Sequence, residues 1–160
     1  MTHYGEISPP EAELGVKSIG LEFLPIVGSG ILACFAKNYL NFPDYTLAKP
    51  NPVHALALIQ LCLGREPIDA LHISAALWQG KGNLSDWEVL DGGRIVIFED
   101  SVKGFISGQE SARLLSALGL NVYLKLIGVS KNPIKIHALQ QKTTHTIENI
   151  NNIHWDSIFS

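Results

Sequence analysis

Long apolar runs, blocks of like charge and cysteines are all scarce in this sequence of 160 residues. No apolar stretch reaches the roughly 18 residues that a membrane-spanning helix needs, so we expect no membrane association. The formal net charge is -3 and there is no basic stripe, so we expect no nucleic-acid partner. The first residues lack the basic start and apolar stretch of a signal peptide, which indicates a cytoplasmic protein.

Cysteine and histidine patterns typical of zinc sites are also missing. The two cysteines, Cys34 and Cys62, lie in apolar periodic segments and are expected to be buried thiols, because a reducing compartment disfavours a disulfide. The six histidines show neither His-x-His nor His-x-x-x-His spacing. The sequence therefore predicts no zinc site.

What is present is an alternation of strand and helix patterns. Strands are expected at 23–27, 45–50, 94–100 and 121–130, and helices at 31–40, 51–64, 66–80, 107–119 and 132–141. Such alternation predicts parallel βαβ units. We expect an α/β fold with a three-layer, Rossmann-like parallel sheet that carries helices on both faces. Residues 1–17 are predicted to be an irregular lead-in, and 18–160 a single domain.

Polar residues of three kinds follow the expected strands. Ser29 follows the first strand, Lys49 ends the second, and Glu99-Asp100-Ser101 ends the third. The carboxyl ends of parallel strands share one edge of a sheet, so these side chains would face one crevice. A hydroxyl, an ammonium and two carboxylates suit a phosphate group with Mg²⁺.

Each of these residues also has a simpler interpretation. Ser29 lies between glycines, which is typical of a turn. Lys49 precedes a proline and fits a solvated loop. Glu99 and Asp100 fit negative charges that stabilise the start of a helix.

Three segments together resemble the later motifs of the haloacid dehalogenase-like hydrolases, a superfamily of mostly Mg²⁺-dependent phosphatases. FLPIVGSG resembles the second motif, AKPNPVHAL the third, and VIFEDSVKGFISGQESARLLSALGL the fourth, within a similarity that runs from Phe23 to Val129. The resemblance implies that Ser29, Gly30 and Lys49 bind phosphate. It also implies that Glu99 and Asp100 hold Mg²⁺.

Two departures from the family bear on activity. The stretch between Pro50 and Arg94 is long, which predicts a helical insertion at about 67–93. The nucleophilic Asp-x-Asp motif of the family occurs nowhere in the sequence, so no catalytic residue is assigned. We therefore expect a fragment or remnant that is inactive alone. The alternatives are a phosphate- or nucleotide-binding module without turnover and a protein-interaction module, with Trp87 and the inserted helix as contacts.

The missing motif would also remove the strand that lies at the centre of the sheet in this family. Its absence would leave backbone groups of the neighbouring strands unpaired. Two outcomes are expected: either the strands that end near Ser29 and Asp100 pair with each other, or another polypeptide fills the gap. That polypeptide would be the segment MTHYGEIS, a second copy of the chain or a separately encoded N-terminal half.

Overall fold

The computed structural model describes residues 15, 18, 20, 23–43, 46–143, 145–153 and 155. The chain divides into two compact units, Met1–Gly82 and Asn83–Ser160. Within the described residues, none of the helices has the length and apolar character needed to cross a membrane. The expectation of a single domain over 18–160 stays a prediction, as does the insertion at 67–93.

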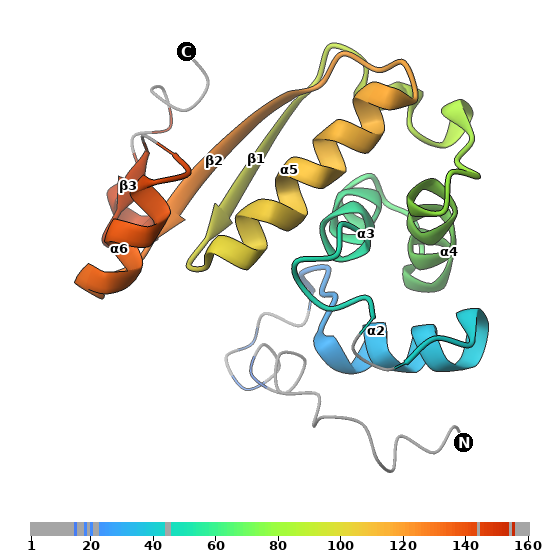
Figure 1. Cartoon of the computed structure of the whole chain (residues 1–160), viewed down its shortest axis with the longest axis horizontal. Coiled ribbons are helices and arrows are strands. Elements are labelled where there is room, and N and C mark those ends of the chain that lie inside the picture. The colour runs from blue at the N-terminus through green and yellow to red at the C-terminus, as the bar shows by residue number, and fades with distance from the viewer. Residues whose placement is uncertain are drawn as a thin grey trace. The chain divides into compact units, whose positions relative to one another are not determined.

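The described part of the first unit is helical. It contains α2 (Ser29–Phe35), the π-helical turn η1 (Ala36–Leu40), α3 (Val53–Cys62) and α4 (Pro67–Trp78), as Figure 1 shows. These helices confirm the predictions at 31–40, 51–64 and 66–80. The side chain of Asn51 accepts a hydrogen bond from the amide of Val53, the first residue of α3, at 2.9 Å. Pro67 occupies the first turn of α4, where its missing N–H costs nothing.

The two strands expected in this unit do not form. Phe23 and Leu24 lie in a turn and bend, and residues 25–28 have no regular structure. Residues 46–50 form turns and a bend, closed by the Asn51 side-chain amide, which donates to the Thr46 carbonyl at 3.0 Å. Pro25 cannot donate to a strand ladder, and no strand among the described residues pairs with either segment. The expected pairing of the strand before Ser29 with the strand before Asp100 is therefore wrong.

The second unit is an α/β unit built on a parallel sheet. Its strands are β1 (Arg94–Glu99), β2 (Tyr123–Val129) and β3 (Thr146–Ile147), in the order β1-β2-β3, and its helices are α5 (Val102–Ala117) and α6 (Pro133–Gln140). Short 3-10 turns lie at η2 (Leu84–Asp86), η3 (Glu88–Leu90) and η4 (Ile150–Asn152). The predicted α/β class with parallel βαβ units is confirmed.

Helices α5 and α6 cover the same face of this sheet. A Cβ added at Gly108 of α5 would lie 2.5 Å from Ile97 and 3.5 Å from Leu126. A Cβ added at Gly128, two residues beyond Leu126 and so on the same face, would meet Leu139 of α6 at 3.1 Å. Right-handed crossovers that proceed in one direction across a sheet place both helices on one side. The second layer of helices that the sequence predicted stays a prediction.

The core of the second unit joins both helices to the sheet. Phe105, Leu126 and Leu139 form one buried cluster, with Ile97 and Leu124 packed against it. Trp87, which the sequence offered as a contact for partners, is fully buried instead. This burial agrees with the commoner place of a tryptophan, which is the core, and contact of the inserted helix with a partner stays a prediction.

Candidate functional site

The candidate site lies where β1 ends and α5 begins. Glu99 is the last residue of β1, Asp100 follows it, and Ser101 is the N-cap residue of α5. Ser101 has extended backbone angles, and its Oγ accepts a hydrogen bond from the Gly104 amide at 3.2 Å. The prediction that a carboxylate pair ends a parallel strand is therefore confirmed.

Glu99 is half-buried and faces the first turn of α5. The Ser101 hydroxyl donates to Glu99 Oε2 at 3.4 Å, which is a long hydrogen bond. A Cβ added at Gly104 would overlap the Glu99 carboxyl group. The carboxylate therefore lies at the positive end of the α5 dipole, in agreement with the simpler interpretation that it stabilises a helix start.

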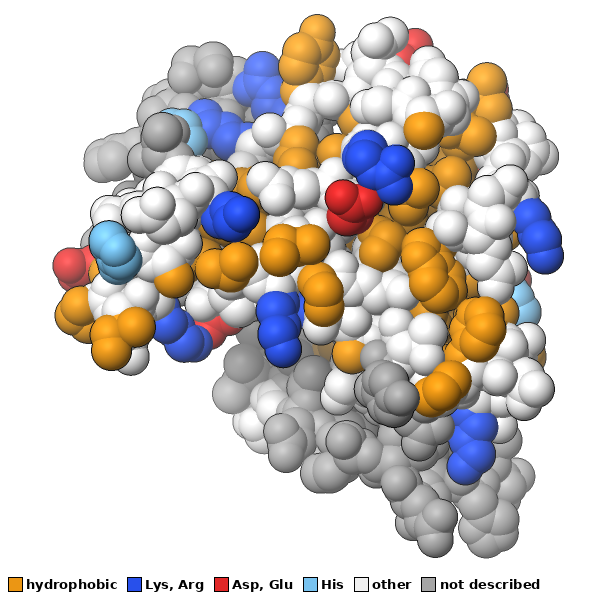
Figure 2. Space-filling view, viewed as in Figure 1, with side chains coloured by type: hydrophobic (Ala, Val, Ile, Leu, Met, Phe, Trp, Pro, Cys, Tyr) orange, Lys and Arg blue, Asp and Glu red, His pale blue; other side chains and the backbone are white. Residues whose placement is uncertain are grey.

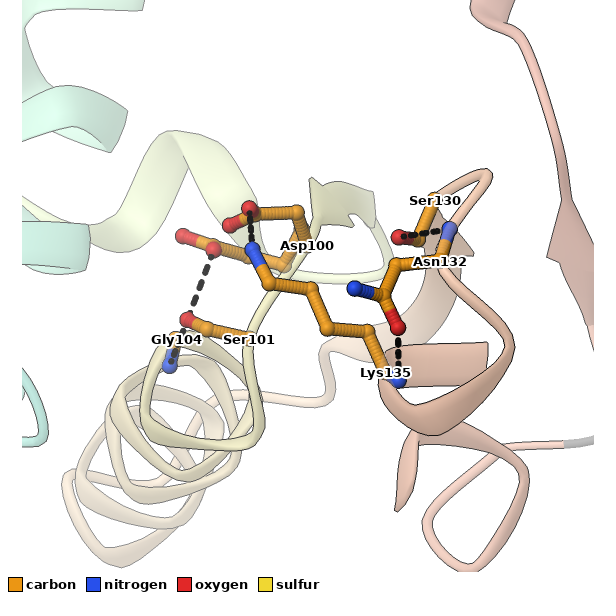
Figure 3. Close-up of polar contacts among 7 residues, drawn as sticks. Asp100, Ser101, Gly104, Ser130, Asn132 and Lys135 are labelled. Carbon is orange, nitrogen blue, oxygen red and sulfur yellow. Dashed lines mark hydrogen bonds and ion pairs between the residues drawn. The ribbon is translucent and has the colours of Figure 1, made fainter. Parts of the chain in front are cut away.

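Asp100 is exposed and forms an ion pair with a residue from another helix. Lys135 Nζ lies 2.6 Å from Asp100 Oδ2, although the two residues are 35 positions apart in the chain (Figure 3). Sequence analysis missed Lys135. A signal was available: Lys135 is the third residue of α6, where a positive charge opposes the helix dipole unless an anion lies nearby.

The start of α6 holds Lys135 close to Asp100. Asn132 is the N-cap, and its Oδ1 accepts hydrogen bonds from the amides of Ile134 at 2.9 Å and Lys135 at 3.3 Å. Ser130 Oγ in turn accepts from the Asn132 amide at 3.1 Å. Since β1 and β2 are parallel neighbours, the helices that follow them both start at the carboxyl end of the sheet.

An open hollow of about 630 Å³ lies at this same end of the sheet. It is lined by residues that end the three strands or follow them: Phe98, Glu99, Asp100, Val129, Ser130, Lys131, Glu148, Asn149 and Ile150. The lining combines carboxylates with one lysine, a hydroxyl and an amide. Among the described residues, no group of three or more His, Cys, Asp or Glu side chains is placed to hold a metal ion.

The predicted phosphate-binding residues belong to the first unit. Ser29 is exposed and opens α2, with Gly28 as the N-cap, and Gly30 is buried. Lys49 is half-buried, and its peptide bond to Pro50 is cis. Glu99 and Asp100 belong to the second unit, so convergence of these residues around one crevice stays a prediction.

One contact connects the segments that carry Ser29 and Lys49. His54 Nε2, in the first turn of α3, lies 3.0 Å from the Val27 carbonyl oxygen and donates to it. Val27 is two residues before Ser29, and His54 is five residues after Lys49. Sequence analysis missed this role of His54, because a single histidine in a helical pattern does not reveal a contact 27 positions away.

In the view of Figure 2, lysine and arginine side chains lie singly or in small groups among polar and apolar ones. Comparisons with protein-family models, curated proteins and solved structures found no match for this chain.

Proposed function

We propose that this chain is a non-catalytic relative of the haloacid dehalogenase-like hydrolases, with an incomplete Rossmann-like core that lacks the nucleophile. The arrangement after β1 carries the proposal: a parallel strand, Glu99, Asp100, the Ser101 cap, Gly104 and a long helix follow one another beside a hollow at the carboxyl end of the sheet. The fourth motif of the family has this order of parts.

The missing aspartate determines the expected activity. Without a carboxylate that attacks phosphorus, the remaining lysines and carboxylates would position a phosphate but form no covalent intermediate. The chain would therefore hydrolyse phosphate esters no faster than a blank. An N-terminal half supplied by another polypeptide would restore the nucleophile.

The direct test is an assay of the purified chain with p-nitrophenyl phosphate and Mg²⁺, with an authentic phosphatase of the family as positive control. We expect no turnover above a protein-free blank, in the wild type and in Asp100→Asn alike. Robust turnover that Asp100→Asn abolishes would overturn the proposal.

The edge of the sheet is the surface at which a partner strand would bind. β1 is the edge strand, and among the described residues only β2 pairs with it. Its sequence RIVIFE is largely apolar and has no proline, and such an edge favours pairing with another strand. We propose that a second copy of the chain or a separately encoded N-terminal half adds a strand here.

Hydrogen–deuterium exchange of the backbone amides of 94–99 tests this pairing. In dilute protein we expect the amides that face away from β2 to exchange quickly. A rise in their protection with protein concentration, together with self-association in sedimentation, would support a second copy. Equal protection at all concentrations in a sedimenting monomer would exclude self-pairing.

A second candidate function is binding of a phosphorylated compound without turnover. Lys131, Ser130 and Asn149 support it, because they offer a charge and hydrogen-bonding groups at the carboxyl end of a parallel sheet. The carboxylates that also line the hollow, Glu99, Asp100 and Glu148, oppose it. We expect inorganic phosphate or a nucleotide to raise the melting temperature, and Lys131→Met to reduce that rise. An unchanged melting temperature at millimolar ligand would count against this candidate.

A further inference from the structure

We propose that Lys135 is a built-in counter-ion for Asp100, and that its ammonium group takes the place at this carboxylate that the family resemblance gives to Mg²⁺. This inference rests on the proposed function, because it concerns the same carboxylates. It adds a residue that lies outside all the resembling motifs, in α6. It also gives the wild-type chain a specific property, which is weak binding of Mg²⁺.

At Asp100 the ammonium group of Lys135 would compete with a second cation for the carboxylate, in an ion pair whose side chains are 51% and 61% exposed. Lys135 Nζ already lies 2.6 Å from Asp100 Oδ2. A magnesium ion binds carboxylate oxygens at about 2.0–2.1 Å and requires a near-octahedral set of oxygen ligands. Such an ion at Asp100 would lie within a few ångströms of the ammonium group, and the two positive charges would repel each other. Carboxylate oxygens suit Mg²⁺ chemically, but they do not fit it while Lys135 stays in place.

The other predicted ligand has a structural role of its own. The Glu99 carboxyl group accepts a hydrogen bond from Ser101 and lies against Gly104, at the positive end of α5. Moving it onto a metal ion would remove an anion from the helix start, which is unfavourable. Both predicted ligands are therefore engaged by parts of this chain that stabilise their negative charge.

The backbone of Lys135 is held in place because the residue lies in the capped first turn of α6. The Asn132 cap fixes the first turn of α6 through two backbone amides, one of them that of Lys135 itself. Figure 3 shows the side chain reaching from α6 across to Asp100, while Ser130 and Asn132 lie near the backbone end of Lys135. The ion pair thus links the β1–α5 junction to the start of α6, within the second unit.

The test is calorimetric titration of the full chain with MgCl₂ at constant ionic strength, which reads metal binding without any activity. We expect weak Mg²⁺ binding by the wild type and binding about three- to fivefold tighter in Lys135→Met, since a competing positive charge at an exposed site is removed. Lys135→Gln serves as a second variant with the same expectation. Combining Lys135→Met with Asp100→Asn should abolish the gain.

Lys142→Met is the matched control, because Lys142 is exposed, has the same charge and lines a different hollow of the same unit. Dissolved ions screen the charge of Lys142 at that separation. The Lys142→Met variant should therefore bind Mg²⁺ with an affinity within about twofold of the wild type. Equal affinities in the wild type, Lys135→Met and Lys135→Gln would overturn the inference. So would a failure of both Lys135 variants to bind Mg²⁺ more tightly than Lys142→Met. Turnover of p-nitrophenyl phosphate is a separate readout, so the proposed function and this inference can fail independently.

Discussion

The carboxyl group of Glu99 lies so close to the Gly104 backbone that a side-chain carbon at position 104 would overlap it. Glu99 ends β1 and Gly104 belongs to the first turn of α5, so the contact joins the strand to the helix that follows. Position 104 requires glycine because any larger residue would clash with the Glu99 carboxyl group, and not because the backbone has a positive φ there. The contact explains why a glycine, which weakens helices, stands in the first turn.

A double-mutant cycle tests this contact. In the Glu99→Ala background, Gly104→Ala should stabilise the protein by about 1 kcal/mol, because alanine is the better helix former. In the wild-type background, the same change forces the carboxylate away from the helix start, so most of that gain should be lost. Urea unfolding followed by far-ultraviolet circular dichroism measures the difference.

Ser116→Ala, at an exposed position of the same helix, provides the control for this cycle. Its effect should be the same in both backgrounds, because distant sites add. A Gly104→Ala effect that is also independent of Glu99 would contradict the proposed contact.

The N-cap at Ser101 gives a second prediction. Ser101→Ala removes the acceptor of the Gly104 amide and should lower the free energy of unfolding by about 1 kcal/mol. Ser101→Asn restores a capping oxygen and should recover most of that loss. Denaturant midpoints of the three proteins check this. Equal losses in both variants would mean that the hydroxyl acts through Glu99 and not through the helix start.

The parts of the fold that the sequence predicted well are those with local signals. The apolar run RIVIFED predicts β1 closely, whereas the helix predicted at 107–119 begins earlier, at Val102, because Ser101 caps its start. The helix predicted at 51–64 is also local in origin, since Asn51 Oδ1 accepts a hydrogen bond from the Val53 amide where α3 begins. In each case, residues within one turn of each other determine the structure.

The predictions failed where the local structure depends on residues that are distant in the sequence. The apolar run before Ser29 is a strand only if another strand pairs with it, and Pro25 removes one of the donors. The ion pair between Asp100 and Lys135 spans 35 positions, so the pattern around Lys135 indicates that an anion lies nearby but does not identify Asp100 as that anion. Whether the residues of the two units meet at one site depends on long-range placement, which no short motif encodes.

Packing of α6 on the sheet gives a third prediction. Leu139 is 1% exposed and belongs to the buried cluster with Phe105 and Leu126, whereas Ile134 on the same helix is 82% exposed. Leu139→Ala should cost about 2–5 kcal/mol through lost burial and the cavity left behind. Ile134→Ala should change stability by less than about 0.5 kcal/mol.

Hydrogen exchange of the amides in β2 is a suitable measurement, because it reports on the second unit even if the two units unfold separately. Protection in β2 should fall in Leu139→Ala and stay unchanged in Ile134→Ala. Similar losses in both variants would mean that α6 packs on the sheet through a different face.

The three tryptophans give a fourth prediction, because their environments differ. Trp87 is fully buried, and its Nε1 has no hydrogen-bond partner among the described residues. Trp78 is half-buried, whereas Trp155 is 56% exposed and packs edge-to-face against Phe98. Trp87→Phe should therefore remove the short-wavelength emission that acrylamide quenches least. Trp155→Phe should remove the most easily quenched component, and Trp78→Phe should fall between them. If Trp87→Phe instead removed the most accessible emission, the indole ring would lie at the surface, where the sequence first suggested a contact with a partner.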